Sequence, residues 1–173
     1  RWRDFWPRWR YPCVVTGAVF VIITMTLPWV LIWSGQTGAR WDPLVRLQGW
    51  TELADSVQRA REIHSRELNE PFVIATGHRY TTSHLAFYLV DQPPVYHWPE
   101  QPGMIESQYQ LWGFPDALDG RDAFVVVPGE SADPPASIRK VFESMRPIET
   151  VEVRRSAQRT RYYTLYIGKS LEL

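Results

Sequence analysis

The sequence predicts an α/β protein: one N-terminal transmembrane helix, then a small extracytoplasmic three-layer α/β domain with a mostly parallel sheet and a C-terminal antiparallel hairpin. Two observations lead to this fold class. An uncharged apolar run lies near the N-terminus, and helix-like and strand-like patterns alternate after it. A length of 173 residues fits one domain, or two at most. We divide the chain into a basic aromatic stub (1–12), a transmembrane helix (13–33), a linker (34–43) and the domain (44–173).

Residues 13–33 form a run of 21 residues without a charged side chain. As a helix that rises about 1.5 Å per residue, this run spans roughly 31 Å, which matches the thickness of a bilayer core. A cleaved signal peptide has the same positive start, but its apolar core is usually about 7–15 residues long. The length therefore favours a retained membrane anchor over a signal peptide.

The charges around the apolar run predict its orientation. The stub carries four arginines and one aspartate, whereas residues 34–39 carry no charge. Because basic flanks stay in the cytoplasm, we expect a bacterial inner-membrane protein with a cytoplasmic N-terminus and a periplasmic domain. Pro28 should free the carbonyl of Thr24, and we expect the hydroxyl of Thr24 or Thr26 to help satisfy the disturbed ladder.

Beyond the linker, the spacing of apolar residues predicts the elements of the domain. Their order predicts a central sheet of about four or five strands, parallel in its core, with a hairpin at one edge. Residues 99–120 are expected to be irregular because they are rich in proline and glycine. The expected elements are helices over 50–68 (N-cap Thr51), 82–89 (capped by Thr81 or Thr82) and 136–145, strands over 72–75, 95–98 and 123–127, and a hairpin of 150–155 with 161–167.

Composition excludes several classes of function. Nineteen basic and nineteen acidic residues balance, which excludes a general nucleic-acid binder. A single cysteine excludes a disulfide framework and a CxxC zinc site. The four histidines lack the spacing of a metal site, and no Gly-rich phosphate fingerprint is present. We therefore expect no metal and no cofactor.

The loop after the first expected strand is a candidate ligand site. Ligands of open α/β sheets bind beyond the carboxyl ends of the strands, where His78, Arg79 and Tyr80 follow. His and Arg side chains can hold a phosphate or carboxylate, although an ordinary polar loop has the same composition, and we favour that reading. Ser83 and His84 lack the sharp turn that a nucleophilic serine usually occupies, so we do not expect Ser-His catalysis.

Two charged clusters allow both a functional and a structural interpretation. Three aspartates around Gly120 suit acid–base chemistry or Mg²⁺, but aspartate also favours turns, and we prefer the turn. Four arginines of the expected hairpin suit an acidic partner or lipid headgroups, or else a solvated sheet edge. These residues are Asp116, Asp119, Asp122, Arg154, Arg155, Arg159 and Arg161.

Aromatic side chains are the main candidates for partner contacts, because they anchor interfaces. They gather in the stub, near the outer end of the span, and in the segment S-Q-Y-Q-L-W, whose amides and rings suit sugar sites and protein interfaces alike. A glycine in the span lets a neighbouring helix approach. The alternative for the helix aromatics is a belt at the lipid headgroups. The expected partner-binding residues are Trp6, Trp9, Gly17, Trp29, Trp33, Tyr109 and Trp112.

Five segments carry a resemblance to a known family. They are P-x-x-R-x-x-G-W-x-x-L-A from Pro43, I-A-T-G-x-x-Y-T-T-S-x-L-A-F-Y-L from Ile74, P-V-Y from Pro94, S-Q-Y-Q-L-W from Ser107 and G-R-D-A-F-V-V from Gly120. In this order they resemble the C-terminal end of bacterial family 39-type glycosyltransferases. These multi-spanning enzymes are similar to protein mannosyltransferases and aminoarabinose transferases, and take sugars from polyprenyl-phosphate donors.

The resemblance implies the last membrane helix and terminal soluble domain of such an enzyme. The family's catalytic acidic residues lie in an extracytoplasmic loop near its N-terminus, and no residue of this sequence matches that loop. We therefore carry over no catalytic residue and expect no enzymatic activity from this chain alone.

Two functions remain at this point, and we favour the first. The first is a non-catalytic single-pass subunit that stabilises a larger assembly of membrane protein subunits, with the layout of small subunits in respiratory or photosynthetic complexes. The second is the C-terminal fragment of a glycosyltransferase, in which the domain shapes the acceptor site. A polyprenyl-phosphate sugar is a partner only in the second reading, whereas the lipid bilayer is a partner in both.

Overall fold

The computed structural model describes residues 2–38, 42–99, 103, 105, 107–156 and 159–172, and among these the side chains of all but residues 2–8, 43 and 44. The chain forms two compact units. One consists of Arg1–Arg46 with Ser156–Gln158, and the other of Leu47–Arg155 with Arg159–Leu173.

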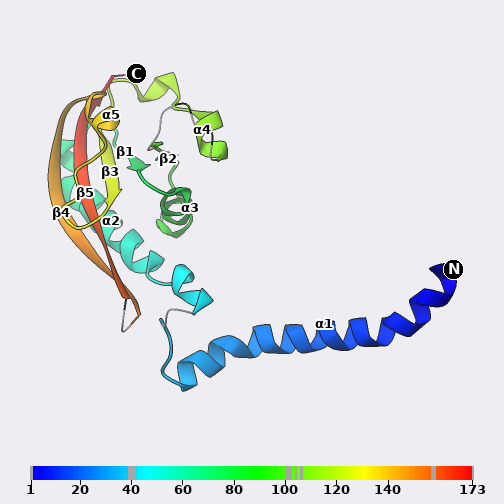
Figure 1. The fold of residues 1–173 in the computed structure, drawn as a ribbon. Helices are drawn as coiled ribbons and strands as arrows, with labels where there is room; N and C mark the ends of the chain where they lie inside the picture. Colours follow the sequence, from blue (N-terminus) through cyan, green and yellow to red (C-terminus); the bar gives the residue numbers. More distant parts are fainter. Residues whose placement is uncertain are drawn as a thin grey trace. The chain divides into compact units, whose positions relative to one another are not determined.

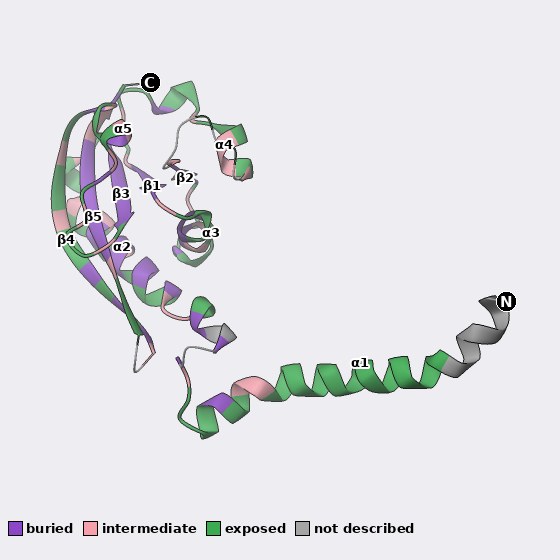
Figure 2. Cartoon of the chain, in the orientation of Figure 1, coloured by how far each residue is buried: buried purple, intermediate pink, exposed green. Residues whose placement is uncertain are grey.

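The first unit is dominated by α1, a 32-residue helix over Trp2–Trp33, so the basic stub and the apolar run share one helix (Figure 1). Within the described residues, Trp9–Trp33 is the one helical stretch that is long and apolar enough to cross a membrane. Most of its residues are exposed (Figure 2). A membrane span and a signal sequence both have these features.

The hydroxyls of Thr24 and Thr26 each donate to the carbonyl four residues before their own position. Thr24 Oγ1 donates to the carbonyl of Phe20 at 2.8 Å, and Thr26 Oγ1 donates to that of Ile22 at 2.8 Å. The expectation that one of them serves the carbonyl freed by Pro28 is therefore wrong, because a helical threonine reaches back to the carbonyl four residues before it.

The second unit is built on a five-stranded sheet in the order β2-β1-β3-β5-β4. β1 (Phe72–Ala75) lies parallel to β2 (Val95–His97) and to β3 (Ala123–Pro128). β3 lies antiparallel to β5 (Arg159–Leu171), which forms a long edge hairpin with β4 (Phe142–Ser156). The sheet is therefore mixed. The expectation of a mostly parallel sheet holds for β2, β1 and β3 only.

The two faces of the sheet are covered differently. On one face, α2 (Trp50–His64) and α3 (Arg79–Tyr88) pack their apolar residues against the strands, including Leu53 and Leu85 against Val73. The other face is covered by the one-turn α5 (Ala136–Arg139), the short 3-10 helix η3 (Asp116–Leu118) and loop aromatics. In the part of the chain that the structure describes, short one-turn helices and loops take the place of the helices expected in the third layer.

Two helix caps, and one stretch that was expected to be irregular, differ from the sequence prediction. α2 begins at Trp50 with Gly49 as N-cap, not Thr51, and Gly49 has φ +82°. A Cβ at Gly49 would lie 2.6 Å from Val153 Cγ1, so both the left-handed backbone and the close strand require glycine. α3 begins earlier than expected, and its N-cap is His78 instead of Thr81 or Thr82. The stretch expected to be irregular contains the short helix α4 (Gln108–Trp112) as well as η3.

The expected helix over 136–145 is mostly wrong. α5 ends at Arg139, and β4 has begun by Phe142. Ile138 and Phe142 are both buried in the same apolar cluster, at a spacing that a helix would also give. This segment forms a strand because it pairs with β5, whose residues lie far from it in the sequence.

Candidate ligand-binding cleft

A cleft lined by aromatic residues lies where β2 meets α3 and α4. It consists of two adjoining hollows of about 390 and 320 Å³, both within the second unit, which share His97, Tyr109 and Gly113. β2 is an edge strand, so the first hollow runs along the free edge of the sheet, and the second lies beyond the strand's carboxyl end. The lining residues are Ala86, Gln92, Pro93, Pro94, Val95, Tyr96, Trp112, Trp98, Pro99, Gly103, Ile105, Gln110, Phe114 and Ser137 besides the shared three.

His97 is the fixed centre of the cleft. It ends β2 and is 5% exposed, and its Nδ1 lies 3.1 Å from the hydroxyl of Thr82 in the first turn of α3. Thr82 is itself fully buried. Because a buried hydrogen bond holds the imidazole, the ring is oriented without any contribution from a ligand.

α4 supplies one wall through Tyr109 and Trp112. The Tyr109 hydroxyl lies 3.0 Å from Ser83 Oγ on α3, and its ring centroid lies 6.0 Å from that of His97. Trp112 packs edge-on against Tyr109 at 5.5 Å, yet it remains 69% exposed. An exposed indole beside a pinned tyrosine is a surface that a ligand or partner can cover.

The two polar residues of the same segment hold the short helix together. The side-chain carbonyl of Gln110 accepts the backbone N–H of Ser107 at 2.8 Å and its hydroxyl at 2.6 Å. This arrangement resembles the reciprocal capping of a helix start, which satisfies donors that a five-residue helix leaves open. Serine and glutamine therefore position the helix, while tyrosine and tryptophan form the wall.

The far side of the cleft is a ladder of aromatic rings. Phe114 stacks on Tyr96 at 5.4 Å and contacts Trp98 at 5.3 Å. The indole N–H of Trp98 donates to Ser137 Oγ at 2.9 Å, which ties the loop after β2 to α5. These contacts fix ring orientation at the carboxyl end of β2, where ligands of α/β sheets bind.

The cleft has the chemistry of a binding site for an uncharged ligand. None of its described lining residues is Asp, Glu, Lys or Arg. Its volume lies within the range of about 300–1,000 Å³ that is typical of small-molecule pockets, which are mostly apolar with a few placed polar groups. Tyr109, Gln110 and Ser137 can supply such groups. A sugar ring, with one apolar face and several hydroxyls, fits this pattern.

The loop that the sequence singled out lies at the start of α3 and does not line the cleft. His78 Nδ1 accepts the backbone N–H of Tyr80 at 3.2 Å, and the rings of the two residues are 4.0 Å apart. The guanidinium of Arg79 lies 5.7 Å from the Tyr80 ring. This geometry is that of a helix N-cap, and anion binding by His78, Arg79 and Tyr80 stays a prediction.

The aspartate cluster is separated by the fold. Asp116 and Asp119 lie in and beside η3 and are exposed, whereas Asp122 is buried. Asp122 pairs with Lys169 at 2.8 Å and accepts the N–H groups of Asn69 and Ser170. Burial acts to raise the pKa of Asp122, but these bonds outweigh burial and lower the pKa below its usual value. Asp122 therefore joins loops of the fold.

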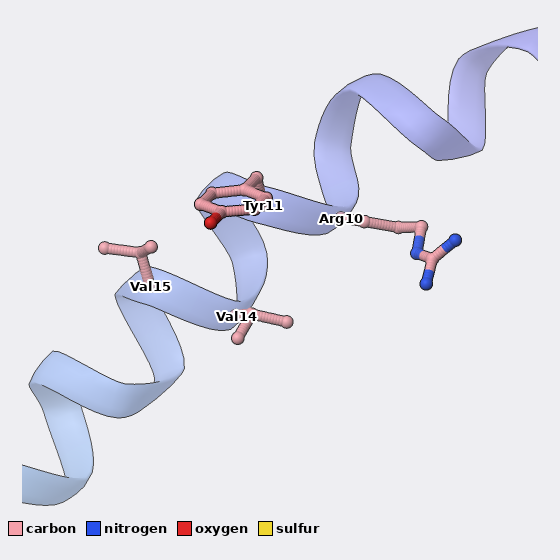
Figure 3. Close-up of a pocket in the computed structure, with 4 residues that line it drawn as sticks. All are labelled: Arg10, Tyr11, Val14 and Val15. Carbon is pink, nitrogen blue, oxygen red and sulfur yellow. The ribbon is translucent and has the colours of Figure 1, made fainter.

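The expected partner residues of α1 lie on an exposed helix. Trp9, Trp29 and Trp33 are exposed, a Cβ at Gly17 would meet nothing within 4 Å, and the side chain of Trp6 lies outside the described residues. A hollow of about 580 Å³ on this helix is lined by Arg10, Tyr11, Val14 and Val15, which project from one helix alone (Figure 3). The described residues give it no second wall, so we treat it as helix surface open to lipid or to another helix.

Comparison of the chain with protein-family models, with curated proteins and with solved structures gave no match in any of the three. The nature of the site therefore rests on its own geometry.

Sequence reasoning found Tyr109 and Trp112 but missed the rest of the cleft. His97 was considered only as a metal ligand, and Ser83 only as a nucleophile. The available signal was the five segments themselves. Three of them, starting at Ile74, Pro94 and Ser107, adjoin here: Ser83 contacts Tyr109, and Pro94, Val95 and Tyr96 line the first hollow beside Tyr109.

Proposed function

We propose that this chain is a non-catalytic, membrane-anchored module of a polyprenyl-phosphate-sugar-dependent glycosyltransferase system. Its aromatic cleft shapes the acceptor site on the periplasmic side of the bacterial inner membrane. The sugar transfer itself takes place on other residues, in the same polypeptide or in a partner subunit.

One observation carries this proposal. The segments that resemble the family 39-type enzymes are scattered over the sequence, and three of them form a single cleft. β1, α3 and β2 form one βαβ unit and adjoin in any such fold, so the informative observation is that the segment from Ser107 also reaches this unit, through the Ser83–Tyr109 contact. The described lining residues include no carboxylate, which further supports binding over catalysis, because glycoside chemistry relies on carboxylates at the reacting bond.

The anchor and its topology form the second part of the proposal. α1 exposes Val, Ile and Phe side chains that water does not favour, and a bilayer satisfies them. The excess of arginine before the apolar run supports a cytoplasmic N-terminus.

Binding of neutral sugars tests the cleft. The full chain in lipid nanodiscs is mixed with methyl glycosides of neutral hexoses and pentoses, and contact is read by saturation-transfer NMR. We expect millimolar binding that Trp112→Ala abolishes and Phe87→Ala leaves intact. Phe87 is a matched control, because it is equally exposed but does not line the cleft. Equal binding by both variants contradicts the proposed site.

A transfer assay tests the non-catalytic part. The purified chain, given a polyprenyl-phosphate sugar and an acceptor glycoside, should show background turnover only. Product formation that depends on Asp116, Asp119 or Asp122 would overturn this part of the proposal.

A structural role in a larger membrane assembly is a second candidate, favoured by the exposed aromatics of α1. In that case Trp→Ala at position 9, 29 or 33 should weaken co-purification with partner subunits by about 2–4 kcal/mol, the usual cost of an interface anchor. Unchanged co-purification by all three variants would assign these rings to the lipid headgroups.

A further inference from the structure

The end of the β4–β5 hairpin carries four arginines with few partners. Arg154, Arg159 and Arg161 are exposed, and none of them forms an ion pair within 4.0 Å in the part of the chain that the structure describes. Elsewhere in the domain, four cations do have carboxylate partners: Arg61, Arg121, Arg146 and Lys169.

The fourth arginine is buried and only partly satisfied. Arg155 is 5% exposed, its guanidinium lies 4.5 Å from the Trp50 ring, and its Nε has no hydrogen-bond partner. Burial, followed by the charge of Arg161, lowers the pKa of Arg155. Glu52 on α2 accepts the backbone N–H of Arg154 at 2.9 Å, and it forms no ion pair within 4.0 Å in the described part of the chain. An anion at this end of the hairpin would therefore relieve repulsion among the arginines.

Ser156, the last residue of β4, lies beside the segment that follows α1. Ser156 belongs to the same compact unit as α1 and the linker. Gly38 lies so close to Ser156 that a Cβ on Gly38 would collide with the serine side chain. Gly38 comes five residues after the end of α1 at Trp33, a distance of at most about 18 Å along an extended chain. Arg154 and Arg159 lie two and three residues from Ser156.

We propose that this hairpin end binds the phosphate groups of anionic phospholipids at the surface of the membrane that α1 enters. The inference rests on the proposed membrane span, and it concerns a different surface from the acceptor cleft. Each arginine near an anionic membrane surface contributes about 1 kcal/mol of attraction, and guanidinium groups pair well with phosphate oxygens.

A quenching experiment tests the proposal on the full chain. Cys13→Ser removes the native cysteine, and a fluorophore is attached through Thr160→Cys at the hairpin or through Ser131→Cys in the β3–α5 loop, both exposed positions. The chain is placed in nanodiscs that contain nitroxide-headgroup lipid in neutral phosphatidylcholine, with or without anionic phosphatidylglycerol.

We expect the anionic lipid to increase quenching at position 160 more than at position 131. Arg159→Gln with Arg161→Gln should lower the ratio of docked to undocked hairpin by roughly 10- to 30-fold. Arg139→Gln with Lys140→Gln removes the same charge from α5 and its end, and it should change little. Raising the salt concentration should weaken the docking.

Three outcomes overturn the proposal: equal quenching in both lipids, equal effects of the two double variants, or loss of docking when inorganic phosphate is added at matched ionic strength. The last would mean that the site prefers free phosphate. Failure of the chain to enter nanodiscs would instead contradict the membrane span, so the two failures can be told apart.

Discussion

The helix α1 and the α/β domain use the same residue types in opposite ways. In α1, residues such as Phe20, Ile22 and Ile23 face outward, whereas in the domain Ile74, Val125 and Ile167 are fully buried. The domain has a buried apolar core of its own, whereas most apolar side chains of α1, apart from Leu31, are not buried by any described residue. The difference teaches that composition alone is ambiguous: burial decides which apolar run is core and which needs a lipid or protein neighbour.

The largest expected effect is a matched pair of isoleucine truncations. Ile74→Ala removes a fully buried side chain from β1 and should lower the free energy of unfolding by about 2–5 kcal/mol. Ile22→Ala changes an exposed residue of α1 and should leave unfolding of the domain within about 0.5 kcal/mol of the parent. Chemical denaturation of both variants in detergent measures the free energy of unfolding. Equal decreases for the two variants would contradict the proposed difference between α1 and the domain.

A second expected effect concerns a polar junction within the domain. Asp122→Ala leaves Lys169 and two backbone N–H groups without their carboxylate, and should cost about 2–4 kcal/mol of folding stability. The exposed Asp119→Ala is the control and should cost less than about 0.5 kcal/mol. A smaller loss at position 122 than at position 119 would show that the buried pair contributes nothing.

The same junction predicts a dependence on pH. Because the pKa of Asp122 is lower in the folded than in the unfolded chain, its contribution is complete above the unfolded value of about 3.9. It is lost as the pH falls through the lower folded value. Acid unfolding should therefore show a smaller drop in stability between neutral pH and pH of about 2 for Asp122→Asn than for the parent. Parallel curves would contradict this assignment.

A smaller, local effect is expected in α4. Ser107→Ala removes the cap that Gln110 completes, which should loosen this helix by about 0.5–2 kcal/mol. Hydrogen exchange of residues 108–112 should quicken, while that of β1 and β3 stays unchanged. Faster hydrogen exchange throughout the sheet would mean that α4 unfolds together with the whole domain and not as a separate local element.

The sequence predicted elements best where burial leaves a local signature. The continuous apolar runs FVIA and AFVVV became β1 and β3, because strands buried on both faces need apolar residues at every position. It failed where partners distant in the sequence decide: Phe142 and Met145 continue a helix-like spacing but lie in β4, opposite β5. Gly49 caps α2 because β4 approaches it closely, which no local pattern reveals.

The candidate site was predictable only in part for the same reason. The segment of Tyr109 and Trp112 stands out by composition, but the cleft depends on Ser83 and Thr82 reaching it from α3 and on His97 reaching it from β2. The periodicity of apolar residues over a short segment does not predict contacts between segments that are distant in the sequence.

Cysteine labelling in intact cells tests the central claim, that α1 holds the α/β domain outside the cytoplasm. The chain carries Ser131→Cys or Asp4→Cys in a Cys13→Ser background, and the native Cys13 serves as the control within the span. A membrane-impermeant maleimide should label position 131 after the outer membrane is permeabilised, position 4 only after lysis, and Cys13 in neither case. Labelling of position 4 with protection of position 131 would show the opposite topology. Equal labelling of all three positions, with the chain in the soluble fraction, would contradict the membrane anchor.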